Sequence, residues 1–324
     1  MEATHTTYDA IIIGAGAAGL TASIYTARKK MATLVISVDI GGQTNLTEHI
    51  ENYPGYFTAT PGFPSGPRLM QIFDEQAKHF GVERIGGKVS QIAKKSSGFI
   101  VELSNGERYE CKVLILTYGK VQRMLGVPGE DKFLGRGVST CATCDAPLFK
   151  NKTVAIVGGG NSALEAAELL AKFATKVYLI HRRDAFRADE ITVDKVKALK
   201  NVELMLNATI AEIRGDKFVT GAAAQNVNTN ARRELALQGV FIEIGYIIDT
   251  ALVKDLVELN ENNEIVINDR CETSCEGLFA AGDLTNVPYK QTVISAGEGA
   301  IAALSAYNYL QKLEGKPAIR SDWG

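Results

Sequence analysis

The feature that most constrains the fold is a glycine-rich turn that occurs twice, each time between an apolar run and a helical segment. The first is Gly14-Ala15-Gly16-Ala17-Ala18-Gly19 and the second is Gly158-Gly159-Gly160-Asn161-Ser162-Ala163. Glycine lets the backbone approach a pyrophosphate, and the helix that follows offers it unpaired N–H groups. A strand, such a turn, a helix and a second strand form the βαβ nucleotide-binding unit. The sequence therefore predicts two of these units in one chain.

The elements expected around the turns follow from apolar runs and from the turn residues between them. Residues 40–67 are rich in Gly, Pro, Thr and Asn, which predicts a long surface excursion. The expected strands are 8–13, 33–38, 112–117, 153–157, 176–180 and 277–280, and the expected helices are a segment ending near Lys30, then 69–80, 163–173 and 292–310.

The last part of the chain has no nucleotide fingerprint of its own, so we expect it to complete the first domain. The fold class predicted is α/β, with two Rossmann-like domains that bind FAD and NAD(P), the second inserted in the first. The two crossings, near 120–126 and 245–250, would form a hinge. The expected domains are 1–120 with 249–324, for FAD, and 121–248, for NADPH and the redox cysteines.

Composition excludes several classes of protein. A chain of 324 residues at 46% hydrophobic content suits two compact domains. A net charge of −2 with scattered Lys and Arg argues against a nucleic-acid partner, and no apolar run reaches the roughly 18 residues of a membrane span. The short polar start indicates no secretory signal, so we expect a cytoplasmic protein, in which a disulfide is typically catalytic.

A pair of cysteines, Cys141 and Cys144, is followed directly by Asp145. In such a C-x-x-C the thiolate of one cysteine reacts and the second sulfur resolves the bond that forms. The alternative is half of a zinc site, but zinc needs four ligands, usually from a second pair at similar spacing, and none is obvious in this chain. Asp145 is expected to move the proton of the thiol chemistry, or alternatively only to cap the turn.

The remaining cysteines and the histidines suggest no metal site. Cys271 and Cys275 form a C-x-x-x-C, for which a second redox pair or half of a metal site is the alternative, but no supporting ligand is nearby, so structural roles are expected, as for many buried free cysteines. The four histidines show no ligand spacing either. We therefore predict no metal.

Two charged features indicate which nucleotide each unit prefers. Asp39 lies twenty residues after Gly19, where an acid accepts from a ribose hydroxyl, although a solvated loop acid is the alternative. After the second unit's second strand come His181, Arg182, Arg183 and, further on, Arg187. Arginine binds phosphate through paired donors, so this cluster suits the 2′-phosphate of NADP rather than being an ordinary solvated charge run.

With these motifs in order, the chain resembles the low-molecular-weight thioredoxin reductases over nearly its full length. The resemblance rests on both glycine turns, the loops Gly41-Gly42-Gln43 and 51–55, the Cys-Ala-Thr-Cys-Asp motif, residues 181–188, Gly282-Asp283 and Tyr289-Lys290-Gln291. The implied FAD contacts are Gly14, Gly16, Ala17, Ala18, Gly19, Asp39, Gly42, Gln43, Asn52, Gly119, Gly282, Asp283, Lys290 and Gln291. The implied NADPH contacts are Gly158, Gly160, Asn161, Ser162, Ala163, His181, Arg182, Arg183 and Arg187.

The resemblance also implies an activity. NADPH would reduce FAD, electrons would pass to the Cys141–Cys144 disulfide, and the dithiol would reduce a thioredoxin-like protein, with the enzyme a homodimer. Cys144 would face the flavin and Cys141 would attack the partner, while the inserted domain rotates. Two other functions stay open: the same relay with another electron donor or a peroxide-detoxifying partner, and a non-catalytic nucleotide sensor, which the intact cysteine motif disfavours.

Four positions depart from the family pattern. Tyr118 and Lys120 flank Gly119 where the family tends to have Ala-Thr-Gly-Ala, Asn161 replaces a common Asp, and Lys290 stands where Arg is frequent. These departures bear on electron-donor preference and on the partner more than on the core reaction.

Overall fold

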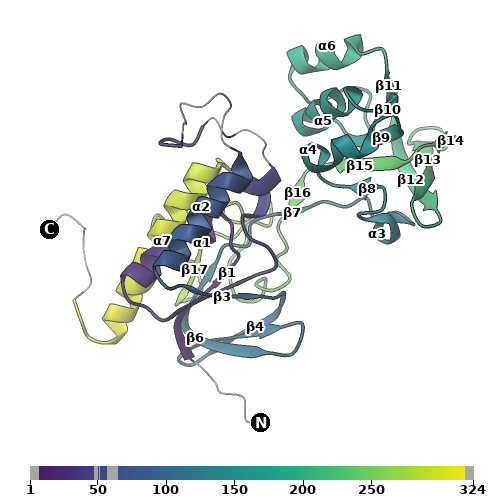
Figure 1. The fold of residues 1–324 in the computed structure, drawn as a ribbon. Coiled ribbons are helices and arrows are strands. Elements are labelled where there is room, and N and C mark those ends of the chain that lie inside the picture. The colour runs from purple at the N-terminus through teal and green to yellow at the C-terminus, as the bar shows by residue number, and fades with distance from the viewer. Residues whose placement is uncertain (1–6, 47–49, 51, 57–64, 318–324) are drawn as a thin grey trace. The chain divides into compact units, whose positions relative to one another are not determined.

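The computed structural model describes residues 7–46, 50, 52–56 and 65–317. Contacts within the chain divide it into two compact units (Figure 1). Unit 1 comprises Met1–Lys120 and Ile248–Gly324, and unit 2 comprises Val121–Ile247. The chain thus leaves unit 1 once and returns to it once.

Unit 1 is built on a parallel sheet of apolar strands. The strand order is β3-β2-β1-β6, and β17 pairs with β6 on a parallel register. Beyond β6 the ladder continues antiparallel through β5 to β4. The strands are β1 (Thr7–Ile13), β2 (Thr33–Ser37), β3 (Glu83–Gly86), β4 (Val89–Lys95), β5 (Gly98–Leu103), β6 (Arg108–Leu116) and β17 (Leu278–Ala280).

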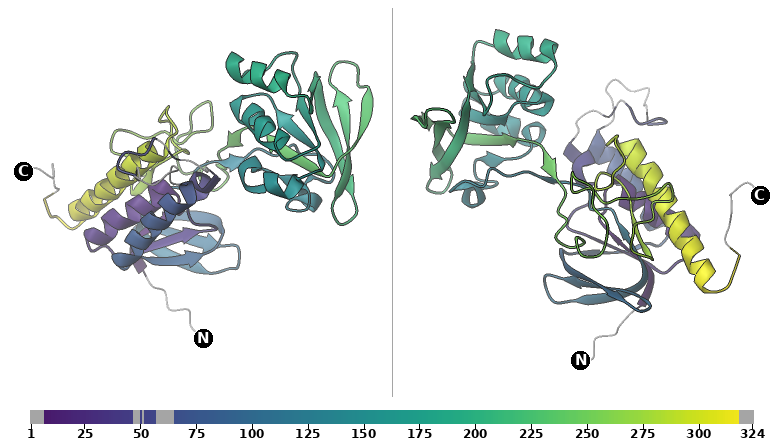
Figure 2. Two further views of the ribbon diagram at one scale, coloured as in Figure 1. Left: turned by 45° about the horizontal axis from the view of Figure 1, so that its top comes forward. Right: turned by 180° about the vertical axis from the view of Figure 1, so that it is seen from behind.

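Helices cover one face of this sheet. Figures 1 and 2 show α1 and α7 lying side by side, in keeping with their small residues. A Cβ at Gly299 of α7 would lie 2.1 Å from the Ala18 carbonyl oxygen of α1, so glycine there permits the close packing. The helical elements are α1 (Ala17–Arg28), the 3-10 turn η1 (Gly42–Leu46), α2 (Gly66–His79) and α7 (Thr292–Leu313).

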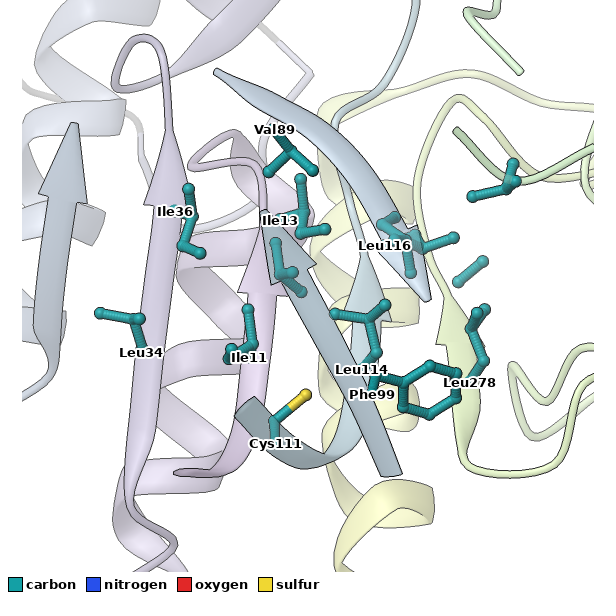
Figure 3. Close-up of a cluster of buried hydrophobic side chains, with 14 of the residues drawn as sticks. Ile11, Ile13, Leu34, Ile36, Val89, Phe99, Cys111, Leu114, Leu116 and Leu278 are labelled. Carbon is teal, nitrogen blue, oxygen red and sulfur yellow. The ribbon is translucent and has the colours of Figure 1, made fainter. Parts of the chain in front are cut away.

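The other face of the sheet is covered by the antiparallel strands. Figure 3 shows Ile11, Leu34 and Leu114 of the parallel strands in one cluster with Val89 of β4 and Phe99 of β5. The residues of β1 therefore alternate between two cores, because side chains of a strand point to opposite faces. A strand buried on both faces is the reason for its continuous apolar run.

Unit 2 repeats this plan. Its parallel sheet has the order β11-β10-β9-β15-β8, with α5 and α6 packed on one face and the antiparallel sheet β12-β13-β14 on the other. The strands are β8 (Val138–Ser139), β9 (Thr153–Gly158), β10 (Lys176–His181), β11 (Val202–Leu206), β12 (Ala208–Gly215), β13 (Val219–Asn226), β14 (Arg232–Ala236) and β15 (Gly239–Glu243). The helical elements are α3 (Glu130–Phe133), α4 (Ala142–Asp145), η2 (Ala146–Phe149), α5 (Asn161–Ala171) and α6 (Glu190–Ala198).

The two segments where the chain passes between the units pair with each other. β7 (Val121–Gln122) and β16 (Tyr246–Ile247) form a two-stranded antiparallel ladder. The Arg123 N–H donates to the Gly245 carbonyl at 2.9 Å, which extends that pairing. Both crossings are therefore short and held together by backbone hydrogen bonds.

The elements expected from the sequence are present, with shifted ends. Helix α2 begins at Gly66 rather than at residue 69, because Ser65 caps it by accepting from the Arg68 N–H at 3.4 Å. Helix α5 begins at Asn161, directly after the glycine turn. The antiparallel strands β4 and β5 and the sheet β12-β13-β14 were not expected.

Candidate active site

The first glycine turn is tightly packed except at one position. Gly14 has φ +110° and a Cβ there would lie 2.5 Å from the Thr117 carbonyl oxygen, while one at Gly19 would lie 1.9 Å from the Gly14 oxygen. The Thr117 hydroxyl donates to the carbonyls of Ile13 and Gly14 at 2.8 and 3.0 Å. Gly16, in contrast, faces open space. Backbone atoms therefore fill the space beside Gly14 and Gly19, whereas the space beside Gly16, the residue before α1, is open.

Two alanine substitutions in this turn are expected to have different effects, one on stability and the other on flavin binding. In Gly19→Ala the new Cβ meets backbone, so unit 1 should lose roughly 1–3 kcal/mol of unfolding free energy. In Gly16→Ala the Cβ meets no described atom, so the apoprotein should melt like the wild type but retain little flavin. Thermal unfolding of the apoprotein and flavin content after purification would separate them. Full flavin content in Gly16→Ala would show that no pyrophosphate approaches this residue.

The other predicted FAD contacts of unit 1 gather at the same edge of its sheet. Strands β1, β2, β6 and β17 are parallel, and Ile13 pairs with both Ile36 and Leu116, which pairs with Ala280. The segments that follow these four strands therefore start side by side, which is where open α/β sheets bind ligands. Those segments contain Gly14 to Gly19, Asp39 to Gln43, Gly119, and Gly282 with Asp283.

Hydrogen bonds tie the loop after β2 to its neighbours. Gly41 N–H donates to Ala15 O at 2.7 Å, and the Gln43 side-chain amide donates to Lys120 O at 2.9 Å. Asp39 is exposed, and its carboxylate accepts from the Gly42 N–H at 3.3 Å. Asp39 thus orders its own turn, and its contact with a ribose hydroxyl stays a prediction.

The residues before α7 join the same region. The Asn52 amide donates to Gln291 Oε1 at 3.0 Å, and Ser295 Oγ donates to Asp283 Oδ1 at 3.3 Å. Lys290 pairs with Glu264, with Nζ and Oε1 3.1 Å apart. Glu51, from the same predicted loop as Asn52, lies outside the described residues.

Buried Glu298 supports the turn after β17, although the sequence did not single it out. Its carboxyl accepts from the Gly282 N–H at 2.7 Å and from the Thr285 hydroxyl at 3.3 Å. Burial raises the pKa of this carboxyl. A glutamate within an alanine-rich helix is the signal that could have marked it, because a buried acid needs partners.

The second glycine turn is built in the same way. A Cβ at Gly158 would lie 2.2 Å from the Glu243 oxygen, and one at Gly159 would lie 2.2 Å from the His181 ring. A Cβ at Gly160, the residue before α5, would meet no described atom within 4 Å. The Ala163 methyl group already lies close to Gly158, which suits a small residue at that position.

The histidine and the arginines that follow β10 divide into one buried side chain and three exposed ones. His181 is buried and stacks on Phe186, with ring centroids 5.5 Å apart. Burial, together with the charges of the three arginines, lowers the pKa of His181. Arg182, Arg183 and Arg187 are exposed, and within the described residues none of them forms an ion pair. Three uncommitted guanidinium groups are thus available to a phosphate.

The cysteine motif starts at the same edge of unit 2 as the second glycine turn. Strand β15 pairs in parallel with β8 on one side and β9 on the other. The motif follows β8, and the glycine turn follows β9. Cys141 is disulfide-bonded, while Cys111, Cys271 and Cys275 are free. The Cys144 side chain lies outside the described part of the structure.

Local hydrogen bonds hold the motif in a short helical turn. The Cys141 N–H donates to Ser139 Oγ at 3.1 Å, and the Ser139 hydroxyl donates back to the Cys141 carbonyl at 3.3 Å. The Asp145 N–H donates to the same carbonyl at 3.1 Å, closing one turn of α4. Half-buried Asp145 is therefore fixed by its backbone one turn after Cys141.

The residues of both turns fit a dinucleotide. Gly16 and Gly160 directly precede α1 and α5, and no side chain in the described residues caps either helix. Their first N–H groups are thus left for an anion, as at other helix N-termini that bind phosphate. The open space beside each of these glycines leaves room for the pyrophosphate. No group of three His, Cys, Asp or Glu side chains with metal-binding geometry occurs among the described residues.

Comparison with known proteins assigns this architecture to a family. The pyridine nucleotide-disulphide oxidoreductase profile matches residues 8–301. The chain belongs to this family. Membership implies the use of a flavin and a pyridine nucleotide. The prediction of a disulfide-reducing enzyme with an α/β fold is confirmed.

Individual members of the pyridine nucleotide-disulphide oxidoreductases match nearly the whole chain. The thioredoxin reductase of Treponema pallidum is 39% identical over 95% of this chain and 99% of its own, and that of Helicobacter pylori is 40% identical over 94% and 99%. The crystal structure of Lactococcus lactis thioredoxin reductase has a TM-score of 0.80 at 36% identity, covering 94% of this chain and 99% of that one. The resemblance to low-molecular-weight thioredoxin reductases is confirmed.

Glu243, at the end of β15, is a further acid in this oxidoreductase that sequence reasoning missed. Burial raises its pKa to about 7, with a smaller contribution from Glu165, while a hydrogen bond from the Ala142 N–H acts in the opposite direction. The Glu243 carboxyl therefore lies beside Ala142, the residue that follows Cys141. An acid that closes an apolar strand was the only signal in the sequence.

Replacing Glu243 with glutamine is expected to change how stability depends on pH. Between the ordinary value of 4.5 and about 7 the unfolded chain releases this proton while the folded chain keeps it, so the free energy of unfolding falls as pH rises. Glu243→Gln removes that loss of stability. The free energy of unfolding of the variant minus that of the wild type should therefore be larger at pH 8 than at pH 5. Urea unfolding of both proteins at the two pH values measures the difference. An equal difference at both would mean that Glu243 ionises normally.

No helix among the residues that the structure describes is long and apolar enough to cross a membrane.

Proposed function

We propose that this chain is an NADPH-dependent thioredoxin-disulfide reductase that holds FAD in unit 1 and NADPH in unit 2. One observation carries the proposal: unit 2 presents a disulfide-bonded Cys141 and an open glycine turn at the same edge of one sheet. The three unpaired arginines beside that turn favour NADPH over NADH. The FAD site rests on the first glycine turn, which is open at Gly16.

The cysteines would carry the exchange with the protein substrate. FAD, when bound, supplies the two-electron chemistry that links a pyridine nucleotide to a disulfide. Reduction of the Cys141–Cys144 disulfide consumes two electrons and two protons and yields two thiols. The Cys141 thiolate then attacks the partner's disulfide and releases one partner thiolate, and Cys144 resolves the mixed disulfide. Both partner thiolates need protons, and we propose that Asp145 exchanges one of them.

The chemistry of the cysteine pair also bears on the protein partner and on the cellular compartment. A reactive dithiol suits a small redox protein of the thioredoxin type, in keeping with the thioredoxin reductases that this chain resembles. We propose in addition a homodimer in the cytoplasm, where Cys111, Cys271 and Cys275 would stay reduced.

The test is the absorbance of the purified protein before and after anaerobic addition of NADPH, followed by oxidised thioredoxin. A flavin band that NADPH bleaches and thioredoxin restores is the expected result. Bleaching only by another reductant would point to a different electron donor. A band that returns with a peroxide-reducing protein but not with thioredoxin would change the partner. Absence of flavin after reconstitution with FAD would favour a nucleotide sensor.

A further inference from the structure

The segment from Arg182 to Asp189, which we call the arginine loop, is fastened at its far end to the second glycine turn. The Arg187 N–H donates to the Gly159 carbonyl at 2.8 Å. Asp189 lies two residues after Arg187, and its Oδ2 accepts from the side-chain amide of Asn161 in the glycine turn at 3.0 Å. The Asp189 N–H donates in return to Asn161 Oδ1 at 2.8 Å. Asn161 and Asp189 thus form a closed ring of two hydrogen bonds.

The side chain of Asp189 bonds to Asn161 and does not cap its own helix. Asp189 is the residue directly before α6, where an aspartate usually accepts from the first N–H groups of the helix. Here its side chain makes no such cap, although its backbone carbonyl accepts from the Thr192 and Val193 N–H groups, both at 3.0 Å, as in other helices. The carboxylate is therefore committed to Asn161.

The chemistry of the pair requires one amide and one carboxylate. An amide offers a donor and an acceptor, whereas a carboxylate only accepts. Aspartate at position 161 would place two acceptors with like charge about 3 Å apart and break the bond to Asp189 Oδ2. The departure at Asn161 is thus matched to Asp189.

We propose that Asn161 and Asp189 form a clasp that holds the arginine loop against the glycine turn and so sets the affinity for the adenosine 2′-phosphate. The near end of the loop follows buried His181, which ends β10, and the Arg183 carbonyl accepts from the Asn207 N–H at 3.0 Å. The far end, with Arg187, is held by the stacking of Phe186 on His181, by the backbone bond to Gly159 and by the clasp, and of these the clasp is the contact between two polar side chains. Asn161 and Asp189 are therefore positioning residues that act through the arginines.

This inference rests on the proposed NADPH site, and a charge swap tests it separately. Three variants are compared with the wild type as FAD-loaded protein: Asn161→Asp, Asp189→Asn and the double variant with both changes. The double variant restores one amide facing one carboxylate and keeps the net charge of the wild type. Binding of NADPH and of adenosine 2′,5′-bisphosphate is titrated, with 5′-AMP as the probe that lacks the 2′-phosphate. Hydrogen exchange of the Arg187 amide reports the loop without any nucleotide.

Asn161→Asp is expected to weaken both 2′-phosphate probes about tenfold, to leave 5′-AMP within about threefold, and to speed Arg187 exchange. The swap should recover most of the affinity and the slow exchange. If the swap stays as weak as Asn161→Asp, position 161 acts on the nucleotide directly and the clasp is overturned. Unchanged exchange and affinity in Asn161→Asp would overturn it too. A wild type that binds 5′-AMP and the 2′,5′-bisphosphate equally would refute the NADPH site rather than the clasp.

Discussion

Replacing either Cys141 or Cys144 with serine is expected to abolish thioredoxin reduction, with turnover falling by about 10³-fold or more. The relay needs both sulfurs, because one attacks the partner and the other resolves the mixed disulfide. Serine keeps the size of the side chain but cannot form a disulfide, so fold and flavin content should be retained. NADPH-dependent turnover with thioredoxin measures the loss, and full turnover by either variant would refute the relay.

The two single variants are also expected to differ from each other. Cys144→Ser leaves Cys141 to attack the partner with nothing to resolve the bond, so mixing it with oxidised thioredoxin should trap a mixed disulfide. Cys141→Ser leaves Cys144, which should instead perturb the flavin absorbance as a nearby thiolate. The assignment of the two roles comes from the family resemblance, and reversed behaviour would exchange them.

A matched control is available at Cys275, which is free and only partly buried. Cys275→Ser should leave turnover nearly unchanged if that cysteine is structural. Cys111 would be a poorer control, since it is packed in the core and burial raises its pKa to about 12. A large loss of turnover in Cys275→Ser would point to a second redox function.

The sequence predicted the parts of each unit that repeat a local pattern. Both glycine turns and the strands beside them follow from short-range signals, because a tight turn, an apolar run and a helix start are set by neighbouring residues. The strands β4 and β5 and the sheet β12-β13-β14 escaped, since their exposed faces break the apolar runs. Side chains that act at long range also escaped. Glu298 meets Gly282, sixteen residues away, and Asp189 meets Asn161, twenty-eight residues away.

Removing two arginines, in the double variant Arg182→Ala/Arg183→Ala, is expected to cost about 10²-fold in NADPH affinity. A single charge-assisted contact is worth roughly 1.5–3 kcal/mol, or about one to two decades, and screening at this exposed site reduces the sum for two. NADH lacks the 2′-phosphate, so its affinity should change by less than about threefold. Flavin reduction by each donor, at low and at high salt, measures both effects.

The preference for NADPH then depends on where the charges lie rather than on how many the unit carries. A control variant, Lys217→Ala/Arg232→Ala, removes the same charge from exposed positions on the antiparallel side of unit 2. Because unit-wide attraction is screened over about 10 Å at 0.1 M salt, the control should keep the wild-type preference. Equal loss in both double variants would indicate general attraction of an anion. Equal use of NADH and NADPH by the wild type would remove the arginine loop from the binding site and leave its exposed charges without a ligand.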